Sequence, residues 1–447
     1  MTTLIKDAKI VNEGIIFTGS VLIENKIISK VFTAEDTLPA ADKTINAKGL
    51  YLIPGVIDDQ VHFREPGNTL KADIESESAA AVLGGVTSFM DMPNNNPPAC
   101  STQALKIKFD IAENKSYSNY SFYLGASNDN IDEIVNLDPK GICGVKVFMG
   151  SSTGNMLVDN QATLEEIFSK SPILVATHCE DENTIKANHL ACMEKYGEDI
   201  PFEQHPLIRS REACIKSSTK AIDLAIRHNT RLHILHISTA EEIDALKDAK
   251  KISNKISGET CVHYLKLNSL QYAELGSKMK CNPAVKDERD MFAIRKGVKE
   301  SVVDVIATDH APHQFSEKCN PYNSAPSGLP LVQHSLQVML KLTSQGIFSL
   351  EHVVEKMCHA PATCFNISKR GFIREGYYAD LCLVDYQPNN AIFTISKENI
   401  AYKCKWSPFE GETFDSKIEY TFVNGQETVS KGQLTGEKSA SALEFDR

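Results

Sequence analysis

Short apolar segments rich in β-branched residues recur along the middle of the chain, with longer segments of helical periodicity between them. Apolar runs of this length, separated by amphipathic stretches, are typical of strands buried on both faces of a parallel sheet. The predicted strands span residues 51–58, 86–92, 120–127, 144–150, 173–179, 231–238, 259–264 and 302–310. Helices are predicted between several of them, at residues 69–85, 161–170, 210–229 and 238–251. This alternation predicts an α/β fold, a (β/α)8 barrel of the TIM type.

Both ends of the chain have a different pattern, in which short β segments follow one another without helices. Residues 8–32 cluster Ile, Val and Phe between turn signals, and β character returns over 371–385 and 419–428. We therefore expect a small β-sandwich built from both chain ends and attached to the central barrel. The expected boundaries are 1–53 and 370–447 for the sandwich and 54–369 for the barrel. Pro and Gly are dense over 312–330, which predicts a long loop after the last barrel strand.

The composition narrows the functional classes. A chain of 447 residues is too long for one small core, which agrees with a large domain plus a satellite. Its formal net charge of −11 argues against a general nucleic-acid binder, because such proteins need a basic face. Lys6, Asp7 and Lys9 interrupt the first apolar runs, unlike a signal peptide, and no window reaches the roughly 18 apolar residues of a membrane span. We expect a cytoplasmic protein without nucleic-acid or membrane partners.

Residues able to bind a metal stand at the carboxyl ends of several predicted strands, where the active sites of such barrels lie. They are His62 with Arg64, Lys146, His178, His236, and Asp309 with His310 and His313. A single histidine at a strand end is more often a structural polar residue, but its repetition over several strands indicates a shared site. Imidazole and carboxylate ligands suit Zn²⁺, and the absence of a C-x-x-C motif favours a catalytic rather than a structural metal.

Two further histidines are left outside the predicted site. His233 lies in the same strand as His236 but points elsewhere by parity. His263 falls at a strand end, where a supporting role is as plausible as contact with a substrate.

A set of motifs along the chain also resembles a known family. These are PGVID…VHFREPG, MPNNNPP, VATHCEDE, LHILHISTAEE, KCNPAV, ATDHAPH and a closing HAPATCFNI…GFIREGYYADLCLVD. In this order and spacing they are similar to the amidohydrolase superfamily and, within it, to the dihydroorotases of the longer, bacterial type. The resemblance spans nearly the whole chain. It implies an enzyme of pyrimidine biosynthesis that closes N-carbamoyl-L-aspartate reversibly to L-dihydroorotate.

The resemblance further implies two zinc ions that share a hydroxide and a lysine carboxylated on its side-chain nitrogen, here Lys146. His178 and His236 would hold one metal, and His62 with Asp309 would hold the other. Asp309 would take the proton from the hydroxide and pass it to the departing nitrogen, as general base and then general acid. An unmodified ammonium in the apolar segment around Lys146 would be costly to bury, which agrees with carboxylation.

The first barrel strand departs from the D-x-H-x-H string usual in this family. It reads Asp58-Asp59-Gln60-Val61-His62, so that Gln60 stands where the first histidine is expected. An amide oxygen is a poorer zinc ligand than imidazole, which leaves three outcomes: two unequal metals, one tight metal with activity retained, or an inactive relative. We expect the metal at His178 and His236 to be tight and the other, with Gln60 as a weak ligand, to be partly occupied.

The substrate contacts are likewise implied by the resemblance. Arg64 and Asn94 would bind the carboxylate of dihydroorotate, and a guanidinium can grip a carboxylate through two parallel hydrogen bonds. Further substrate contacts are expected from Asn282, His313, Ser327 and Gly328. Arg64 also separates the dihydroorotases from close relatives whose substrates lack the ring carboxylate.

Two alternatives stay open. One is another cyclic amidase of the superfamily, similar to a dihydropyrimidinase, hydantoinase or allantoinase. The other is a non-catalytic dihydroorotase-like protein that associates with aspartate transcarbamoylase, for which Gln60 is the one argument in the sequence. Such barrels often pair, which leaves a homodimer open as well.

Overall fold

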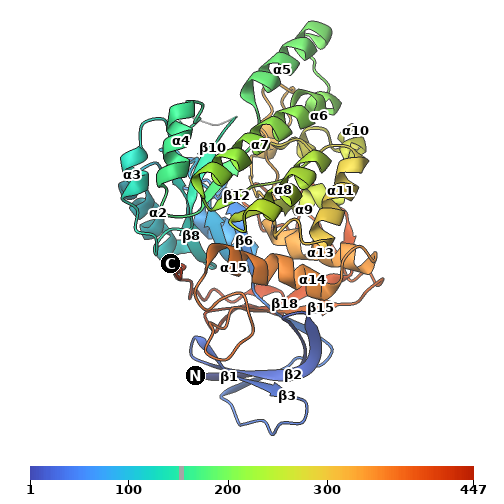
Figure 1. Cartoon of the computed structure of the whole chain (residues 1–447). Coiled ribbons are helices and arrows are strands. Elements are labelled where there is room, and N and C mark those ends of the chain that lie inside the picture. Colours follow the sequence, from blue (N-terminus) through green and yellow to red (C-terminus); the bar gives the residue numbers. More distant parts are fainter. Residues whose placement is uncertain (151–155) are drawn as a thin grey trace.

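The barrel expected from the middle of the chain is confirmed by the computed structural model, which describes residues 1–150 and 156–447 (Figure 1). Parallel pairing links its strands in two runs, β6-β7-β8 and β9-β10-β11-β12-β13-β14. The strands are β6 (Val56–Val61), β7 (Val86–Asp91), β8 (Asn119–Phe122) with its continuation β9 (Leu124–Gly125), β10 (Val145–Phe148), β11 (Val175–His178), β12 (Leu232–Ile234), β13 (Ile256–Cys261) and β14 (Val305–Ala307). A parallel bridge between Val61 and His310 joins the first strand to the end of the last. The barrel is therefore closed.

The strands of the barrel are buried almost throughout, which explains why apolar residues predominate in most of them. Every residue of β10 and of β11 is buried, because helices cover the outside while side chains fill the inside. Val145, Val175 and Leu232 pair across three neighbouring strands and belong to the main hydrophobic core.

The helices that cover the barrel begin at side chains that cap their first turns. Asn160, Ser210 and Thr239 each accept a backbone N–H at the start of a helix, which satisfies donors that the helix itself leaves free. The longer helices are α1 (Ile74–Leu83), α2 (Thr102–Lys115), α4 (Gln161–Lys170), α5 (Glu182–Tyr196), α7 (Arg211–His228), α8 (Ala240–Ile252), α11 (Glu288–Lys299) and α13 (Ser335–Ser344). The shorter ones are α3 (Ile131–Val135), α6 (His205–Ile208), α9 (Val262–Lys266), α10 (Tyr272–Leu275), α12 (Phe315–Lys318), α14 (Leu350–Val354) and α15 (Ala360–Phe365).

Strands from both chain ends form a separate sheet domain, as expected (Figure 1). Its order is β20-β19-β18-β15-β5-β1-β2-β3, with β4 paired to β1. The strands are β1 (Thr2–Asn12), β2 (Ile15–Glu24), β3 (Ile27–Thr33), β4 (Lys43–Asn46), β5 (Tyr51–Pro54), β15 (Leu381–Tyr386), β18 (Ser416–Val423), β19 (Gln426–Ser430) and β20 (Gln433–Leu434). Leu52 of β5 pairs with Leu383 of β15, and both belong to a hydrophobic cluster of this domain. A small hairpin-like pair, β16 (Phe393–Thr394) with β17 (Thr413–Phe414), lies apart from this sheet.

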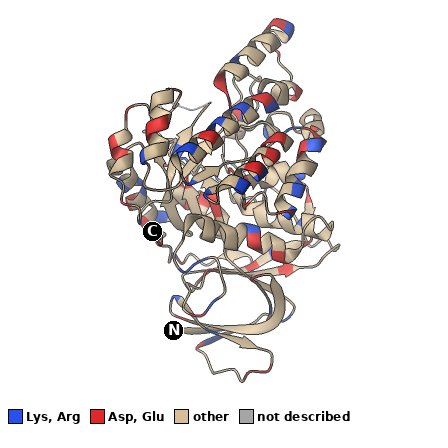
Figure 2. Ribbon diagram, in the orientation of Figure 1, with Lys and Arg blue, Asp and Glu red and all other residues tan. Residues whose placement is uncertain are grey.

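Acidic and basic residues are interspersed over the outer helices rather than gathered by sign (Figure 2). Within the two described stretches, no helix has both the length and the apolar character needed to span a bilayer. The Pro- and Gly-rich segment 312–330 contains one short helix, α12, and its Leu329 forms a bridge with His310 next to the barrel.

Candidate active site

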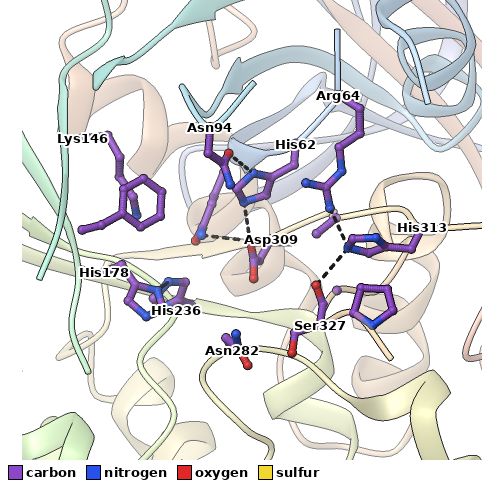
Figure 3. Close-up of a pocket in the computed structure, with 15 residues that line it drawn as sticks. His62, Arg64, Asn94, Lys146, His178, His236, Asn282, Asp309, His313 and Ser327 are labelled. Atoms are coloured by element: carbon purple, nitrogen blue, oxygen red, sulfur yellow. Dashed lines mark hydrogen bonds and ion pairs between the residues drawn. The ribbon is translucent and has the colours of Figure 1, made fainter. Parts of the chain in front are cut away.

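A cavity of about 340 Å³ opens at the carboxyl ends of the barrel strands and brings together the residues that the sequence singled out, except His310, which is buried against Glu77 (Figure 3). Its lining includes Gln60, His62, Arg64, Asn94, Lys146, His178, His236, Asn282, Asp309, His313, Ser327 and Gly328. These residues come from segments far apart in the chain. They meet because the barrel closes between β14 and β6. The geometry of each group shows what it can bind.

His178 and His236 end two neighbouring strands, and their ring nitrogens face each other. Nδ1 of His178 lies 2.9 Å from Nε2 of His236, with the rings nearly perpendicular at 78°. Nε2 of His178 donates to Glu180 at 3.0 Å, so that the neutral ring directs its lone pair toward His236. Burial lowers the pKa of both imidazoles, which favours the neutral form that binds metals. A carboxylate behind a histidine is also a common way to orient a metal ligand.

His62 and Asp309 form the other half of the cluster. Nδ1 of His62 donates to Oδ1 of Asn94 at 2.7 Å, so that the neutral ring has its lone pair on Nε2. This lone pair faces Oδ1 of Asp309 at 3.0 Å. Two acceptors at this distance attract each other only when a proton or a cation lies between them. Asn94, expected as a substrate contact, thus already orients His62 through its amide oxygen.

Gln60 extends from β6 toward the same carboxylate. Its amide Nε2 donates to Oδ1 of Asp309 at 3.0 Å, while its Oε1 is buried and has no hydrogen-bond partner within the part of the chain that the structure describes. Asp309 is therefore held through one oxygen, and Oδ2 takes part in no hydrogen bond with a described residue. The unsatisfied Oε1 of Gln60 thus lies beside two further acceptors, Nε2 of His62 and Oδ1 of Asp309, and such a group fits a site that binds a cation.

Lys146 lies inside β10 with its ammonium in the same cavity. The residue is 1% exposed, and across residues 1–150 and 156–447 no hydrogen bond or ion pair holds its Nζ. The nearest aromatic ring is that of Phe148, with its centroid 4.6 Å away. Burial lowers the pKa of Lys146 to about 8, because the charged form loses its hydration. The donor set of imidazoles, a carboxylate and a lysine with a readily neutral amine fits a divalent metal site with a carboxylated lysine.

Arg64 lies on the substrate side of the cavity, and its backbone has a φ of 66°. Its Nε donates to the carbonyl of Pro312 at 3.1 Å, and its NH2 group lies 3.1 Å from Nε2 of His313. Its neighbour in the chain, Glu65, forms an ion pair with Lys115 and not with Arg64. Among the described residues the guanidinium contacts no carboxylate. It is thus available to an anionic ligand.

A second group of metal-capable side chains lies outside the cavity lining. Asp59, His233 and Glu259 place three ligand atoms within 4.8 Å of one another, an arrangement that could hold a metal ion. Nε2 of His233 is 3.1 Å from Asp59 and 3.4 Å from Glu259, and Nδ1 is 2.8 Å from Ser257. The ring nitrogens of His233 are thus already engaged.

This buried group touches the cavity through the backbone. Oε1 of Glu259 accepts the backbone N–H of His236 at 3.1 Å. The backbone of His236 has a φ of 41°, a conformation that residues other than glycine seldom adopt. The sequence placed His233 outside the predicted site, and His233 does not line the cavity, but Asp59 and Glu259 were not predicted at all. The available signal was an acidic residue in, or directly after, a predicted barrel strand. His263 is also buried, and neither ring nitrogen has a hydrogen-bond partner in the described ranges.

Comparisons with known proteins identify the family of the chain and its fold. The family model described as "Amidohydrolase family" matches residues 51–428. The dihydroorotase of Endomicrobium trichonymphae is 32% identical over 444 residues, which cover 95% of this chain and 99% of that protein. The dihydroorotase of Methanosarcina acetivorans is 30% identical over 435 residues, covering 94% and 91%. The solved L-hydantoinase (dihydropyrimidinase) of Arthrobacter aurescens superimposes with a TM-score of 0.92 over 99% of both chains at 23% identity, a likeness of fold.

Proposed function

The chain belongs to the amidohydrolase family, and we propose that it is a dihydroorotase, which interconverts N-carbamoyl-L-aspartate and L-dihydroorotate. Membership of this family makes the chain a hydrolase, and the proposal adds which substrate it acts on. The observation that carries it is Arg64, a cavity guanidinium that contacts no described carboxylate and faces the cluster of imidazoles and Asp309. The curated relatives named as dihydroorotases support the same substrate.

The residues of the cavity would hold two zinc ions. His178 and His236 would bind one, His62 and Asp309 with Gln60 as a weak ligand would bind the other, and carboxylated Lys146 would contact both. When bound, such ions polarise the amide carbonyl and lower the pKa of a water molecule, so that attack is feasible near neutral pH.

Asp309 would move the proton. Gln60 donates to its Oδ1, and Nε2 of His62 lies 3.0 Å from the same oxygen, which leaves Oδ2 to accept a proton from the attacking water. In ring opening, the new C–O bond forms at the ring carbonyl, the C–N bond breaks, and Asp309 returns the proton to the departing nitrogen. Ring closure is the reverse, with loss of water. Arg64 would hold the substrate carboxylate, together with Asn94, His313 and Asn282, while Ser327 and Gly328 would contact the ring.

Replacing Arg64 by methionine tests the substrate assignment. We expect the wild-type protein to hydrolyse dihydroorotate and to lose this activity when its metal is removed by a chelator. The R64M substitution should raise the KM for dihydroorotate about 10- to 100-fold, which corresponds to the free energy of one lost hydrogen bond to a charged group. Metal content should stay the same. The measurement is steady-state hydrolysis with metal analysis, using dihydrouracil and hydantoin as substrates without the carboxylate.

Three results would contradict this proposal. An unchanged KM in R64M would remove the carboxylate contact. Faster turnover of dihydrouracil or hydantoin than of dihydroorotate would favour a dihydropyrimidinase or hydantoinase. No turnover of any cyclic amide by the zinc-loaded protein would favour a non-catalytic relative.

Replacing Gln60 by histidine should strengthen the weaker metal site. An imidazole in this position offers a better ligand than an amide oxygen, so we expect the second zinc to bind about tenfold or more tightly. After dialysis against a weak chelator, the wild type should keep one zinc per chain and Q60H two. His178→Ala serves as the control, because it should remove the tighter zinc instead. Two equally tight zincs in the wild type would refute the proposed inequality.

A further inference from the structure

Two buried lysines lie behind the substrate side of the cavity, and in the described part of the chain neither forms an ion pair. Lys318 is fully buried, and Lys280 is 8% exposed. Nζ of Lys318 donates to the backbone carbonyls of Lys280 at 3.1 Å, Pro326 at 2.8 Å and Gly328 at 3.1 Å. Buried lysines are seldom left without a carboxylate, since desolvation of the ammonium is costly.

The contacts favour the charged form of Lys318, and they surround the amine of Lys280 with carbonyl oxygens and a ring face. An ammonium has three N–H donors, and Lys318 directs one at each of three carbonyls, whereas a neutral amine would leave one carbonyl facing a lone pair. Nζ of Lys280 donates to the carbonyls of Tyr322 and Ala325, each at 2.6 Å, and lies 4.3 Å from the centroid of the Tyr322 ring. Burial lowers the pKa of Lys318 to about 7 and that of Lys280 to about 8, which reflects the cost of these charges.

These hydrogen bonds join two segments that line the cavity. Asn282 lies two residues after Lys280, and Ser327 and Gly328 lie in the loop that Lys318 spans. The carbonyl of Lys280 accepts both from Nζ of Lys318 and from the N–H of Gly328 at 2.9 Å. Gly328 has a φ of 143°, and a Cβ there would come within 2.4 Å of the Ala311 carbonyl oxygen. The loop is thus tied to the 280–282 segment at a point of close backbone approach.

The charge near the cavity is unbalanced as well. Arg64 contacts no carboxylate among the residues described, and the nearby Lys71 is paired with Glu317 at 3.1 Å. Among the described residues Asp309 is the one carboxylate in the cavity lining, and the lysines behind the loop, when protonated, add two positive charges that no described carboxylate pairs with. Such an excess is unfavourable in the empty protein and is offset when an anion binds.

We propose that Lys318 and Lys280 are positioning residues that fix the substrate-contacting loop and, through their uncompensated charge, select carboxylate-bearing ligands over neutral cyclic amides. This inference rests on the proposed function, which it deepens by assigning part of the anion selectivity to groups that do not touch the substrate. Ring-opened N-carbamoyl-aspartate, with two carboxylates, should gain more from this charge than the ring with one.

The test compares two ligands that differ by one carboxylate, orotate and uracil, binding to the zinc-loaded protein in a calorimeter. Lys318→Gln keeps N–H donors for the loop carbonyls but removes the charge. We expect K318Q to weaken orotate about tenfold and to change uracil by less than about threefold. Lys280→Gln should act in the same direction. Lys299→Met, an exposed lysine at the end of α11, is the matched control for loss of one charge and should leave both affinities unchanged.

The outcomes separate charge selection from fixation of the loop, and they separate this inference from the proposed dihydroorotase function. Equal weakening of orotate and uracil in K318Q would overturn charge selection, and unchanged affinities in both lysine variants would overturn the whole inference. If K318Q does not fold, K280Q and the Lys318→Arg variant, which should retain the preference for orotate, decide the question. If the wild type prefers orotate to uracil and K318Q loses that preference, but dihydroorotate is not hydrolysed, the inference holds and the proposed function fails.

Discussion

Replacing Asp309 by asparagine should lower kcat for dihydroorotate hydrolysis by about 10³-fold, the usual contribution of a general acid–base residue. Asparagine keeps an oxygen for the contacts with His62 and Gln60, both at 3.0 Å, but its amide cannot take up a proton in the place of Oδ2. Orotate affinity should change by less than about threefold, because the contacts of Arg64 remain. Steady-state kinetics, orotate calorimetry and zinc analysis of the same preparation measure these effects.

Asp304 supplies the matched control for this substitution. It lies just before β14, at the opposite end from Asp309, and its side chain pairs with Lys250 at 2.7 Å. We expect D304N to keep kcat within about threefold, as is usual for substitutions away from the reacting atoms. A D309N enzyme that retains kcat within tenfold at full zinc occupancy would show that another group carries the proton. Loss of zinc from D309N would assign its defect to the metal instead.

The barrel could be predicted because its strands and helices differ in pattern. β10 and β11 show no strict alternation of polar and apolar residues, since both faces are buried. Helices such as α4 and α7 begin next to Asn160 and Ser210, capping residues that are visible in the sequence. Very short strands such as β16 and β20 could not be predicted, because a pair of residues becomes a strand through its neighbour rather than through its own pattern.

The cavity residues followed from one rule, that active sites of such barrels lie at the carboxyl ends of strands. This rule and the resemblance together located Lys146, His178, His236 and Asp309, all of which line one cavity. Parity also predicted that His233 and His236 point to different sides, and of the two only His236 is among the described residues that line the cavity. Groups that act through backbone atoms leave no such signal.

The buried cations and acids illustrate this limit. Lys318 contacts two carbonyls of its own irregular loop and one of the 280–282 segment, and Glu259 accepts the N–H of His236. The roles of both residues therefore depend on the folded path of the chain and not on sequence spacing. The loop around Lys318 has no periodicity from which its path could be inferred. Sequence reasoning therefore finds residues that point into a site more readily than residues that hold its backbone.

Lys146→Met should lower kcat about 10³-fold and reduce zinc retention, while the protein stays folded. The reason is the chemistry of the buried amine. A neutral amine attacks carbon dioxide to form a carbamate and release a proton, which changes a buried cation into an anionic ligand. With a pKa of about 8, roughly a quarter of Lys146 is neutral at pH 7.5, compared with about one in a thousand for an ordinary lysine.

The pKa of Lys146 also predicts how the activation of metal-free protein by zinc and carbon dioxide depends on pH. Below pH 8 the amine is mostly charged and unreactive, so the rate at which zinc and carbon dioxide activate metal-free protein should rise with pH and level off above about 9 at fixed dissolved carbon dioxide. Zinc-loaded protein prepared with ¹³C-bicarbonate should show a carbamate carbon signal by NMR, which K146M should lack.

Lys356→Met separates this chemistry from the mere loss of a buried lysine. Lys356 is 4% exposed and lies outside the cavity lining, and burial lowers its pKa as well. K356M should retain zinc, kcat and the carbamate signal. A neutral amine contributes to activity only where its carbamate can bind metal ions, and Lys356 lies outside the cavity that would hold them. If K146M bound two zincs and kept its activity, or if the wild type showed no carbamate signal at full zinc occupancy, the bridging role of Lys146 would be wrong. The unpaired position of its amine in the cavity would then need another explanation.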